Sequence, residues 1–215
     1  MDVLWDNRQL LADAFGQTLA LLGVSGLISL VWGTVLGSFR VSAVPALRGV
    51  GTAYVTVFRN TPLLVVFVLI YYGLPELEIR PSVFWRSTLA LSLYTSAFIC
   101  EAVRSGVNAV AAGQAEAARS IGMGFGQTLR IVVLPQAFRA VIPPLANVFI
   151  ALAKNTSLVA AFGVADLTFR MRGLINDNPG DVYAIFGGIA LCYVLIVVAI
   201  SLTARGLERS VAVAR

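Results

Sequence analysis

Four charged side chains lie inside otherwise apolar stretches of this sequence. They are Arg59, Glu101, Arg104 and Lys154. Ionisable groups are costly to bury in such segments and often contact a charged solute. Arg59 can line a solute path, or it can extend its guanidinium to a membrane surface. Glu101 and Arg104 are spaced i, i+3, and we expect them to form an ion pair that supports their helix.

Lys154 opens the short polar run Lys154-Asn155-Thr156-Ser157. Together with Pro143-Pro144, this run predicts two interruptions in one long apolar helix. Thr156 or Ser157 can cap a new half-helix and direct its N–H groups toward a carboxylate, and Lys154 adds positive charge there. The alternative is that Lys154 ends in lipid headgroups and that the two hydroxyls bond their own backbone.

The sequence contains no catalytic or metal-binding constellation. It has no histidine, and its two cysteines, Cys100 and Cys192, lie in apolar runs where packed thiols are expected. It has no paired acids or nucleophile motif, and no phosphate-binding G-x-x-x-x-G-K-[ST] loop. We therefore expect no metal site and no enzymatic activity in this chain, ATP hydrolysis included.

A polar, glycine-rich segment interrupts the apolar sequence near its middle, with the sequence GQAEAARSIGMGFGQTLRIVVLPQ at 113–136. Its first ten residues favour helix, Gly122 and Gly124 permit a turn, and Pro135 marks the start of the next helix. The segment is predicted to form a short surface helix, a glycine bend and a return. Its small and apolar side chains can lie in lipid headgroups or dock on a protein partner.

These features must be positioned by helices that cross a membrane. Hydrophobic residues make up 58% of the 215 residues and charged residues only 13%, whereas soluble domains carry about 25% charged residues. The mean hydropathy is +0.85. We predict an all-α integral membrane protein, a single domain over residues 1–215. Its five spans, of about 20 apolar residues each, are expected at about 14–38, 52–74, 85–108, 138–163 and 182–204. Gly33 and Gly37 form a G-x-x-x-G pattern that can mark a helix-packing face.

The charges in the loops and at the ends of these spans are distributed unequally between the two sides of the membrane. One side has nine cations and two acids, namely Arg40, Arg48, Arg104, Arg119, Arg130, Arg139, Arg205, Arg209 and Arg215 against Glu116 and Glu208. The other has five cations and eight acids, namely Arg8, Arg80, Arg86, Arg170 and Arg172 against Asp2, Asp6, Asp13, Glu76, Glu78, Asp166, Asp177 and Asp181. Cytoplasmic loops carry the excess of Lys and Arg. We therefore predict an outside N-terminus, an inside C-terminus and a cytoplasmic segment at about 113–130, and no nucleic-acid partner.

The polar segment also carries a spaced motif. Glu116-Ala117-Ala118 is followed by Gly122, Val132 and Leu134-Pro135, which resembles the EAA…G…I-x-LP motif of permease subunits of bacterial ATP-binding-cassette (ABC) importers. Val132 stands where that motif usually has isoleucine. Four further blocks resemble the polar amino-acid branch of the family: RNTPLL at 59–64, LIYYGLP at 69–75, EAVRSGVNAVAAGQAEAARSIGMGFGQT at 101–128 and KNTSL at 154–158.

The resemblance implies the fold of a type I ABC importer permease and a multi-pass location in the bacterial cell membrane. The segment 113–130 would be the coupling helix, which docks on a cytoplasmic ATPase. The residues implied in coupling are Glu116, Ala117, Ala118, Gly122, Met123 and Gly124. A dimer of that separate ATPase would bind ATP and Mg²⁺, so no cofactor is expected in this chain. A sister or identical permease would complete the pore, and an extracytoplasmic binding protein would deliver the amino acid.

The substrate path implied by these blocks involves Arg59, Asn147, Lys154, Asn155, Thr156 and Ser157. Relatives often read N-E-F-I where this chain has Asn147-Val148-Phe149-Ile150, and many have aspartate at the position of Asn155. The loss of both acids disfavours a cationic amino acid. The blocks most resemble glutamate permeases of actinobacteria, which implies glutamate, with glutamine or another polar amino acid as the alternative. A stand-alone secondary carrier is a further alternative.

Overall fold

The chain is helical throughout the part that the structure describes. A computed structural model describes residues 2–211. Its α-helices are α1 (Asp2–Asp6), α2 (Arg8–Arg40), α3 (Pro45–Asn60), α4 (Leu63–Glu76), α5 (Val83–Asn108), α6 (Ala112–Ser120), α7 (Phe125–Gln127), α8 (Leu134–Asn155), α9 (Leu167–Asp177) and α10 (Val182–Val211). A π-helix, η1 (Thr128–Val133), precedes α8, and a 3₁₀-helix, η2 (Thr156–Phe162), follows it. The predicted all-α class is confirmed.

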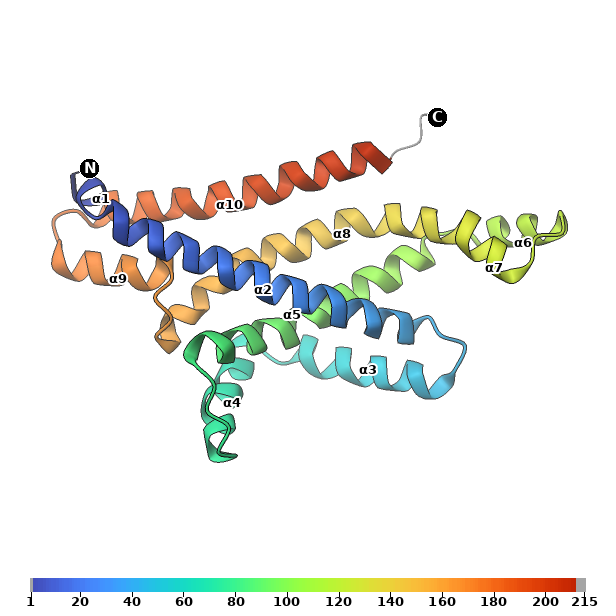
Figure 1. The fold of residues 1–215 in the computed structure, drawn as a ribbon, viewed down its shortest axis with the longest axis horizontal. Helices are drawn as coiled ribbons and strands as arrows, with labels where there is room; N and C mark the ends of the chain where they lie inside the picture. The colour runs from blue at the N-terminus through green and yellow to red at the C-terminus, as the bar shows by residue number, and fades with distance from the viewer. Residues whose placement is uncertain (1, 212–215) are drawn as a thin grey trace.

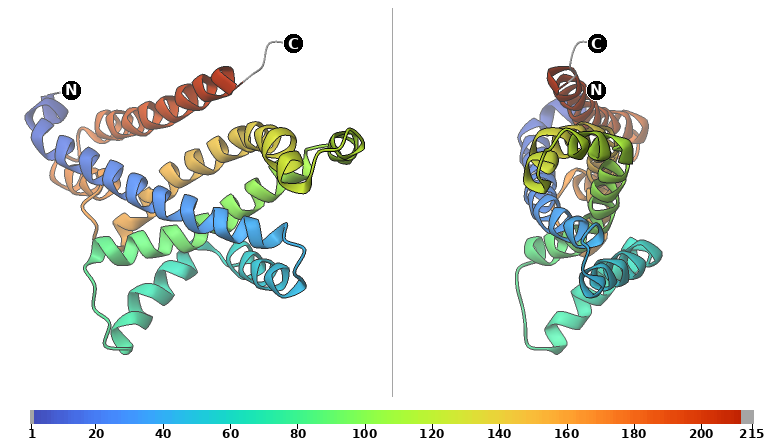
Figure 2. Two further views of the ribbon diagram at one scale, coloured as in Figure 1. Left: turned by 45° about the vertical axis from the view of Figure 1, so that its right-hand side comes forward. Right: turned by 90° about the vertical axis from the view of Figure 1, so that its right-hand side faces the viewer.

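The long helices lie side by side along the long axis of the molecule. α2, α8 and α10 follow this axis (Figure 1), and α5 packs against both α2 and α8. The N-terminus and α9 lie at one end of the bundle, and the α6–α7 segment projects from the other. A turned view shows the same separation and shows α4 leaving the bundle sideways (Figure 2). The last turns of α10 point toward the end that carries α6, so α1 and the last turns of α10 lie apart.

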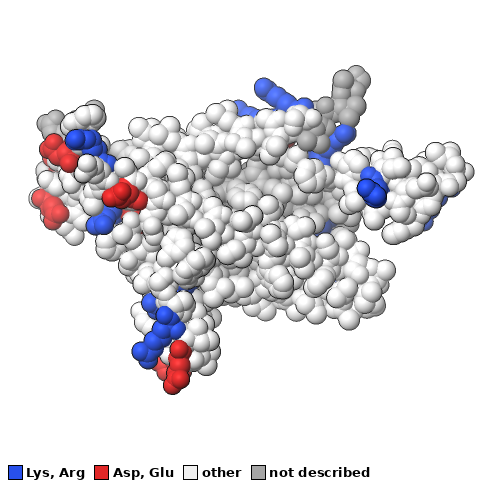
Figure 3. Space-filling view, viewed as in Figure 1, with Lys and Arg blue, Asp and Glu red and all other residues white. Residues whose placement is uncertain are grey.

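Charged side chains gather at the ends of the molecule. On the face shown in Figure 3, charged atoms lie at both ends of the bundle and at the tip of α4, and the surface between them is largely uncharged. Three helical segments are long and apolar enough to cross a membrane: Arg8–Arg40, Phe125–Phe162 and Val182–Ser210. The uncharged band therefore coincides with the part of the bundle that these segments build.

α5 lies at the centre of the bundle and is less apolar than those three segments. Its 26 residues extend about 39 Å, which exceeds a bilayer core of about 30 Å. Its buried polar residues are Ser87, Thr88, Ser92, Thr95 and Ser96. The Ser92 hydroxyl donates to the carbonyl of Ser25 (3.4 Å), and the Tyr54 hydroxyl donates to the carbonyl of Leu93 (2.9 Å). Neighbouring helices thus bond some of the polar groups of α5 that lipid would not satisfy, whereas the buried hydroxyls of Ser87 and Thr88 have no hydrogen-bond partner among the described residues.

Glycines allow α2 and α5 to approach closely. A Cβ atom added to Gly33 would lie 2.7 Å from the Cβ of Ile99, and one added to Gly37 would lie 2.8 Å from the Cβ of Val103. Because no side chain fits there, the backbones of the two helices lie nearly in contact. The G-x-x-x-G pattern therefore marks a helix-packing face, as predicted.

The segment predicted as a span at 52–74 consists of two helices with a break between them. α3 ends at Asn60, α4 begins at Leu63, and the two helices are bent by 100°. Thr61 and Pro62 have extended backbones, with ψ angles of 128° and 136°. The cause is local, because a proline disfavours the helical conformation in the residue before it.

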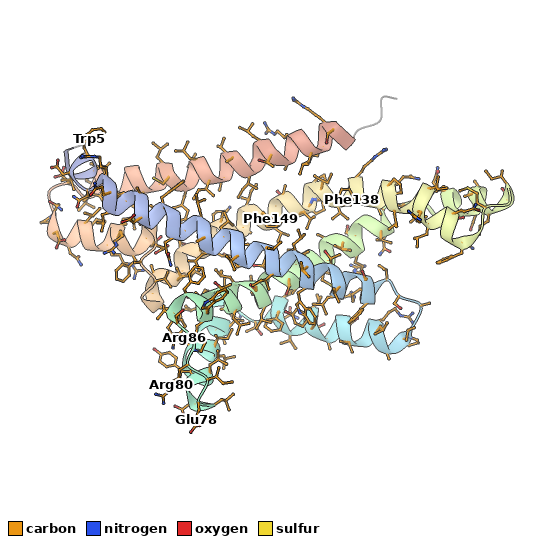
Figure 4. All side chains as sticks on the ribbon, in the orientation of Figure 1. Trp5, Glu78, Arg80, Arg86, Phe138 and Phe149 are labelled. Carbon is orange, nitrogen blue, oxygen red and sulfur yellow. The ribbon has the colours of Figure 1, made fainter. Side chains whose placement is uncertain are left out.

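α4 forms an arm that is attached at its base and leaves the bundle. Near the base, the buried Phe67 ring stacks on the ring of Phe162 at a centroid distance of 5.0 Å. The Arg86 guanidinium lies 4.5 Å from the centroid of the Tyr71 ring. Glu78 and Arg80 lie at the tip of the arm (Figure 4). The outer faces of α4 are apolar and exposed, so this element leaves a large apolar surface beside the bundle.

The predicted break at Pro143-Pro144 is wrong, because α8 continues through both prolines. Proline has a helical φ angle, so inside a helix it removes hydrogen bonds and kinks the axis without having to end the helix. The second interruption is confirmed. The α-helix ends at Asn155, and the tighter η2 continues to Phe162.

One buried carboxylate attaches α9 to the bundle. Asp166 accepts hydrogen bonds from the backbone N–H of Phe169 (2.9 Å) and from the Tyr193 hydroxyl (3.1 Å). The N–H of Leu167 donates to the Thr18 hydroxyl (3.2 Å). Burial raises the pKa of the Asp166 carboxyl. These bonds join α2, α9 and α10 at the end of the bundle opposite α6, which gives Asp166 a structural role as a helix cap.

Gly33→Leu is expected to destabilise the fold. The new side chain would overlap Ile99, so α2 and α5 would have to separate, at a cost of about 1–3 kcal/mol. Thermal unfolding of the purified protein in detergent measures this loss. Gly23→Leu in the same helix is the control, because nothing lies within 4 Å of its Cβ position. An equal loss in both variants would contradict the role of close packing at Gly33.

Candidate functional site

Three arginines from three helices surround the carboxylate of Glu101. Arg104, one turn further along α5, donates to it at 2.8 Å, and Arg40 at the end of α2 lies 3.0 Å from it. Arg59, near the end of α3, lies 3.6 Å from it. The predicted pair of Glu101 and Arg104 is confirmed, and two further cations join it. This Glu101 cluster ties α2, α3 and α5 together.

The Glu101 cluster is partly protected from solvent and carries an excess of positive charge. The Glu101 side chain is 19% exposed, and that of Arg40 is 17% exposed. Arg59 is 45% exposed, and its guanidinium carbon also lies 5.4 Å from the centroid of the Phe98 ring. Arg59 therefore contacts α5 through one charged and one aromatic side chain.

A cavity of about 380 Å³ lies between α5 and α8. Asn147 and Asn155, both predicted on the substrate path, line it from α8 together with Val148. Tyr94 and Phe98 line it from α5. Positions 147, 151 and 155 are each four residues apart, so they form one stripe of α8. The cavity thus has amide and phenol groups on otherwise apolar walls, as small-molecule sites often do.

Sequence reasoning missed the contribution of α5 to this cavity. Between Ala90 and Ala102, every residue of α5 is buried except Leu93, Tyr94, Phe98 and Glu101. Residues 94, 98 and 101 are spaced i, i+4 and i+7, so they form one partly exposed stripe on a buried helix. The spacing of two aromatic residues and an acid among small side chains was the available signal. Arg40 was also missed, because it lies in a loop by hydropathy alone.

The structure separates the members of the polar run at the end of α8. Asn155 lines the cavity, whereas Lys154 is exposed and does not line it. The hydroxyl of Thr156 donates to the carbonyl of Ala153 (2.7 Å), and that of Ser157 donates to the carbonyl of Lys154 (2.7 Å). Neither hydroxyl caps η2, so the predicted capping role is wrong. A hydroxyl that donates to the carbonyl of the preceding turn points back toward that turn and away from the N–H groups of the next one.

The segment from α6 to α7 forms an elbow, defined here as residues 112–127. α6 ends in a Schellman motif, in which the N–H of Met123 bonds the carbonyl of Ala118 (3.1 Å) and the N–H of Gly122 bonds that of Arg119 (2.9 Å). Gly122 has a φ angle of +90°, which side chains other than glycine rarely adopt. Gly124 begins α7, and its N–H donates to the Gln127 side chain (3.0 Å). The predicted helix, bend and return are therefore present.

The elbow presents small and apolar groups at its surface. Glu116, Ala117 and Gly122 are exposed. Ile121 is 78% exposed and Phe125 is 73% exposed. Ala118 differs, since it is 5% exposed and belongs to the helix that packs on η1. Ala118 therefore holds the elbow together from inside, and its neighbours form the outer surface; Met123 is intermediate.

Within residues 2–211, no group of three or more His, Cys, Asp or Glu side chains is arranged to hold a metal ion. The described side chains offer hydrogen bonding by amides and ion pairing by arginines, and the elbow offers an exposed surface of small and apolar groups.

Comparison with known proteins identifies the family. Residues 29–213 match the family described as the inner membrane component of binding-protein-dependent transport systems. The chain belongs to this family. The glutamate transport system permease protein GluC of Corynebacterium glutamicum is 38% identical to the permease described here, over 99% of each chain. The probable glutamine ABC transporter permease protein GlnM of Bacillus subtilis is 36% identical over 97% of this chain and 96% of its own.

A solved structure agrees with this assignment. A chain in the crystal structure of an amino acid ABC transporter with histidines superposes on this permease with a TM-score of 0.88. The two chains are 30% identical, and the match covers 96% of each. The chain is thus a multi-pass permease subunit of an amino-acid ABC transporter in the bacterial inner membrane, and the resemblance seen in the EAA motif is confirmed. It is a non-catalytic subunit, and a separate subunit hydrolyses ATP.

Glu101→Gln is expected to destabilise the permease more than Arg104→Gln does. The first change leaves three guanidinium groups without their common anion, whereas the second leaves Glu101 paired with Arg40 and Arg59. We expect a loss of roughly 2 kcal/mol for Glu101→Gln, less than for a fully buried pair. Thermal unfolding in detergent at low and high salt measures it. Equal stability of the two variants would contradict a central role of Glu101.

Proposed function

We propose that this permease forms half of the translocation path of an ATP-driven importer for glutamate. The observation that carries the proposal is the exposed elbow, which has the EAA-motif residues at its bend and projects from one end of a bundle whose helices suit a membrane. An exposed apolar tip on a short rigid helix suits a groove on a separate protein. The partner that fits is the dimeric ATPase of the transporter, which would bind the ATP and Mg²⁺.

The proposed topology has five spans, with the N-terminus outside and the C-terminus inside. Supporting it, α5 is long enough to cross the bilayer and buries its hydroxyls against its neighbours, and α3 with α4 would form one broken span. The elbow and the last turns of α10 lie toward the same end of the bundle (Figure 1). The excess of arginine in the loops at that end supports a cytoplasmic location. α9, at the opposite end, would then face the extracytoplasmic binding protein.

The proposed coupling passes from the elbow into the bundle through η1 and α8. Ala118 seats α6 on η1, and η1 continues directly into α8. A displacement of the elbow by the ATPase would therefore move α8, which carries Asn147 and Asn155. Glu116, Ala117, Gly122, Met123 and Gly124 are the proposed contact residues. Exposed Ile121 and Phe125 would add apolar contact area.

The proposed substrate path runs along the cavity between α5 and α8. The stripe of α8 that lines this cavity, at positions 147, 151 and 155, is not covered by another helix among residues 2–211. A sister or identical permease would therefore have room to close the path. Arg59 lies beside Phe98 at the edge of the cavity. Lys154 would act at a distance, by its charge, because it does not line the cavity.

The cavity supports an anionic or neutral amino acid over a cationic one. It contains the amides of Asn147 and Asn155 and the apolar Val148, with no carboxylate among its lining residues. The nearest charges, in the Glu101 cluster, sum to a positive value. The relatives named for glutamate and for glutamine transport are nearly equally similar to this chain. In this proposal the positive charge of the Glu101 cluster favours glutamate, and glutamine is the alternative.

The proposed function is tested by reconstituting the permease in proteoliposomes with the ATPase, binding protein and any sister permease encoded beside it. We expect uptake of labelled glutamate that requires ATP and continues after a protonophore collapses the proton gradient. A panel of unlabelled amino acids then ranks the substrates by competition. Uptake that needs the proton gradient and not ATP would identify a secondary carrier and overturn the proposal.

Gly122→Val is expected to abolish ATP-driven uptake while the permease remains folded. A β-branched residue at a φ angle of +90° is strained, so the Schellman motif would open and the elbow would lose its shape. Uptake and thermal unfolding are measured on the same preparation. Gly113→Val in the same segment is the control, since Gly113 has no positive φ angle and nothing lies within 4 Å of its Cβ position. Normal uptake by Gly122→Val would count against the coupling role.

A further inference from the structure

A second cavity, of about 360 Å³, adjoins the Glu101 cluster. Arg40, Arg59 and Glu101 line it together with Thr56 and Asn60. Its walls are polar and charged, in contrast to the mostly apolar cavity between α5 and α8. Arg104 does not line it, although Arg104 bonds the same carboxylate.

The two cavities lie next to each other along one stripe of α5. Tyr94 and Phe98 line the first cavity, and Glu101, three residues further along the helix, lines the second. The Phe98 ring lies between them, and the guanidinium carbon of Arg59 lies 5.4 Å from its centroid. Arg59 therefore lines the second cavity and also contacts Phe98 of the first, so it lies where a solute would pass from Asn147 and Asn155 toward the Glu101 cluster.

Arg59 is the most weakly held of the three arginines. Its distance to the Glu101 carboxylate is 3.6 Å, against 3.0 Å for Arg40 and 2.8 Å for Arg104. Its side chain is also the most exposed of the three, at 45%. If Arg59 turned away, Glu101 would keep two guanidinium partners, so the movement would leave no unpaired carboxylate.

We infer that Arg59 exchanges Glu101 for the side-chain carboxylate of an acidic amino acid during translocation. A guanidinium binds a carboxylate through two parallel hydrogen bonds, and a neutral amide offers neither the charge nor the second acceptor. Arg40 and Arg104 retain Glu101 while the exchange lasts, and Glu101 draws Arg59 back after the solute has left. Arg59 is thus a specificity-determining residue that prefers glutamate to glutamine. The inference rests on the proposed import of polar amino acids.

The test measures equilibrium binding of labelled glutamate and glutamine to the permease–ATPase complex in lipid nanodiscs, without the binding protein, so that only the selectivity of the membrane subunits is observed. We expect the wild type to prefer glutamate. Arg59→Gln should weaken glutamate binding about tenfold or more, as for the loss of a charged hydrogen bond, and should leave glutamine binding unchanged. Arg59→Lys should retain part of the preference, because it keeps the charge without the paired donors.

Arg104→Gln is the matched control. It removes one arginine from the same carboxylate without changing the lining of the second cavity, so the preference for glutamate should persist. Equal loss of both ligands in Arg59→Gln, equal binding of both by the wild type, or undetectable glutamate binding by the wild type would overturn the inference. ATP-dependent uptake by the complete transporter is measured alongside and tests the proposed import function separately. If uptake is present but binding shows no preference for glutamate over glutamine, only the role of Arg59 is refuted.

Discussion

The close packing of α5 is the constraint on which the rest of this permease depends. Gly33 and Gly37 bring α2 into near contact with one side of it, and a Cβ atom on Gly106 would overlap Val141 of α8 on another. Small and hydroxyl-bearing residues make this possible and leave α5 less apolar than α2, α4 and α8, which pack around it. Among the described residues, the central turns of α5 are buried apart from Leu93 and the stripe of Tyr94, Phe98 and Glu101, so this stripe is where α5 can present polar and aromatic groups to a solute.

The polar sites of the permease lie at different positions along the bundle. Asp166 joins α2, α9 and α10 at one end, and the elbow with its glycine bend projects from the other. The Glu101 cluster lies between the elbow and the asparagine stripe and ties three helices together. The Asp166 and Glu101 sites each use a carboxylate whose partners come from different helices. Such sites can respond to relative movement of the helices, whereas the apolar contacts around them hold the bundle together.

Much of this arrangement could be predicted from the sequence, because it depends on local rules. The helix-forming run before Gly122, the entry at Pro135 and the spacing of Glu101 and Arg104 are encoded within a few residues. The approach of Arg40 and Arg59 to Glu101 and the pairing of Tyr94 with Asn147 depend on which helices pack together, which no short pattern encodes. The prolines show the same limit. Pro62 ends a helix and Pro143-Pro144 does not, although the same local rule applies to all three.

The π-helical turn η1 has a consequence for the register of α8. A π-turn accommodates more residues than an α-turn, and here it precedes Pro135, which has no N–H to donate to the carbonyl of Ile131. Because a π-turn advances the chain by fewer degrees per residue than an α-turn, η1 sets the rotation of α8 about its axis relative to the elbow. It thereby fixes which face of α8, the one with Asn147 and Asn155, lies toward α5.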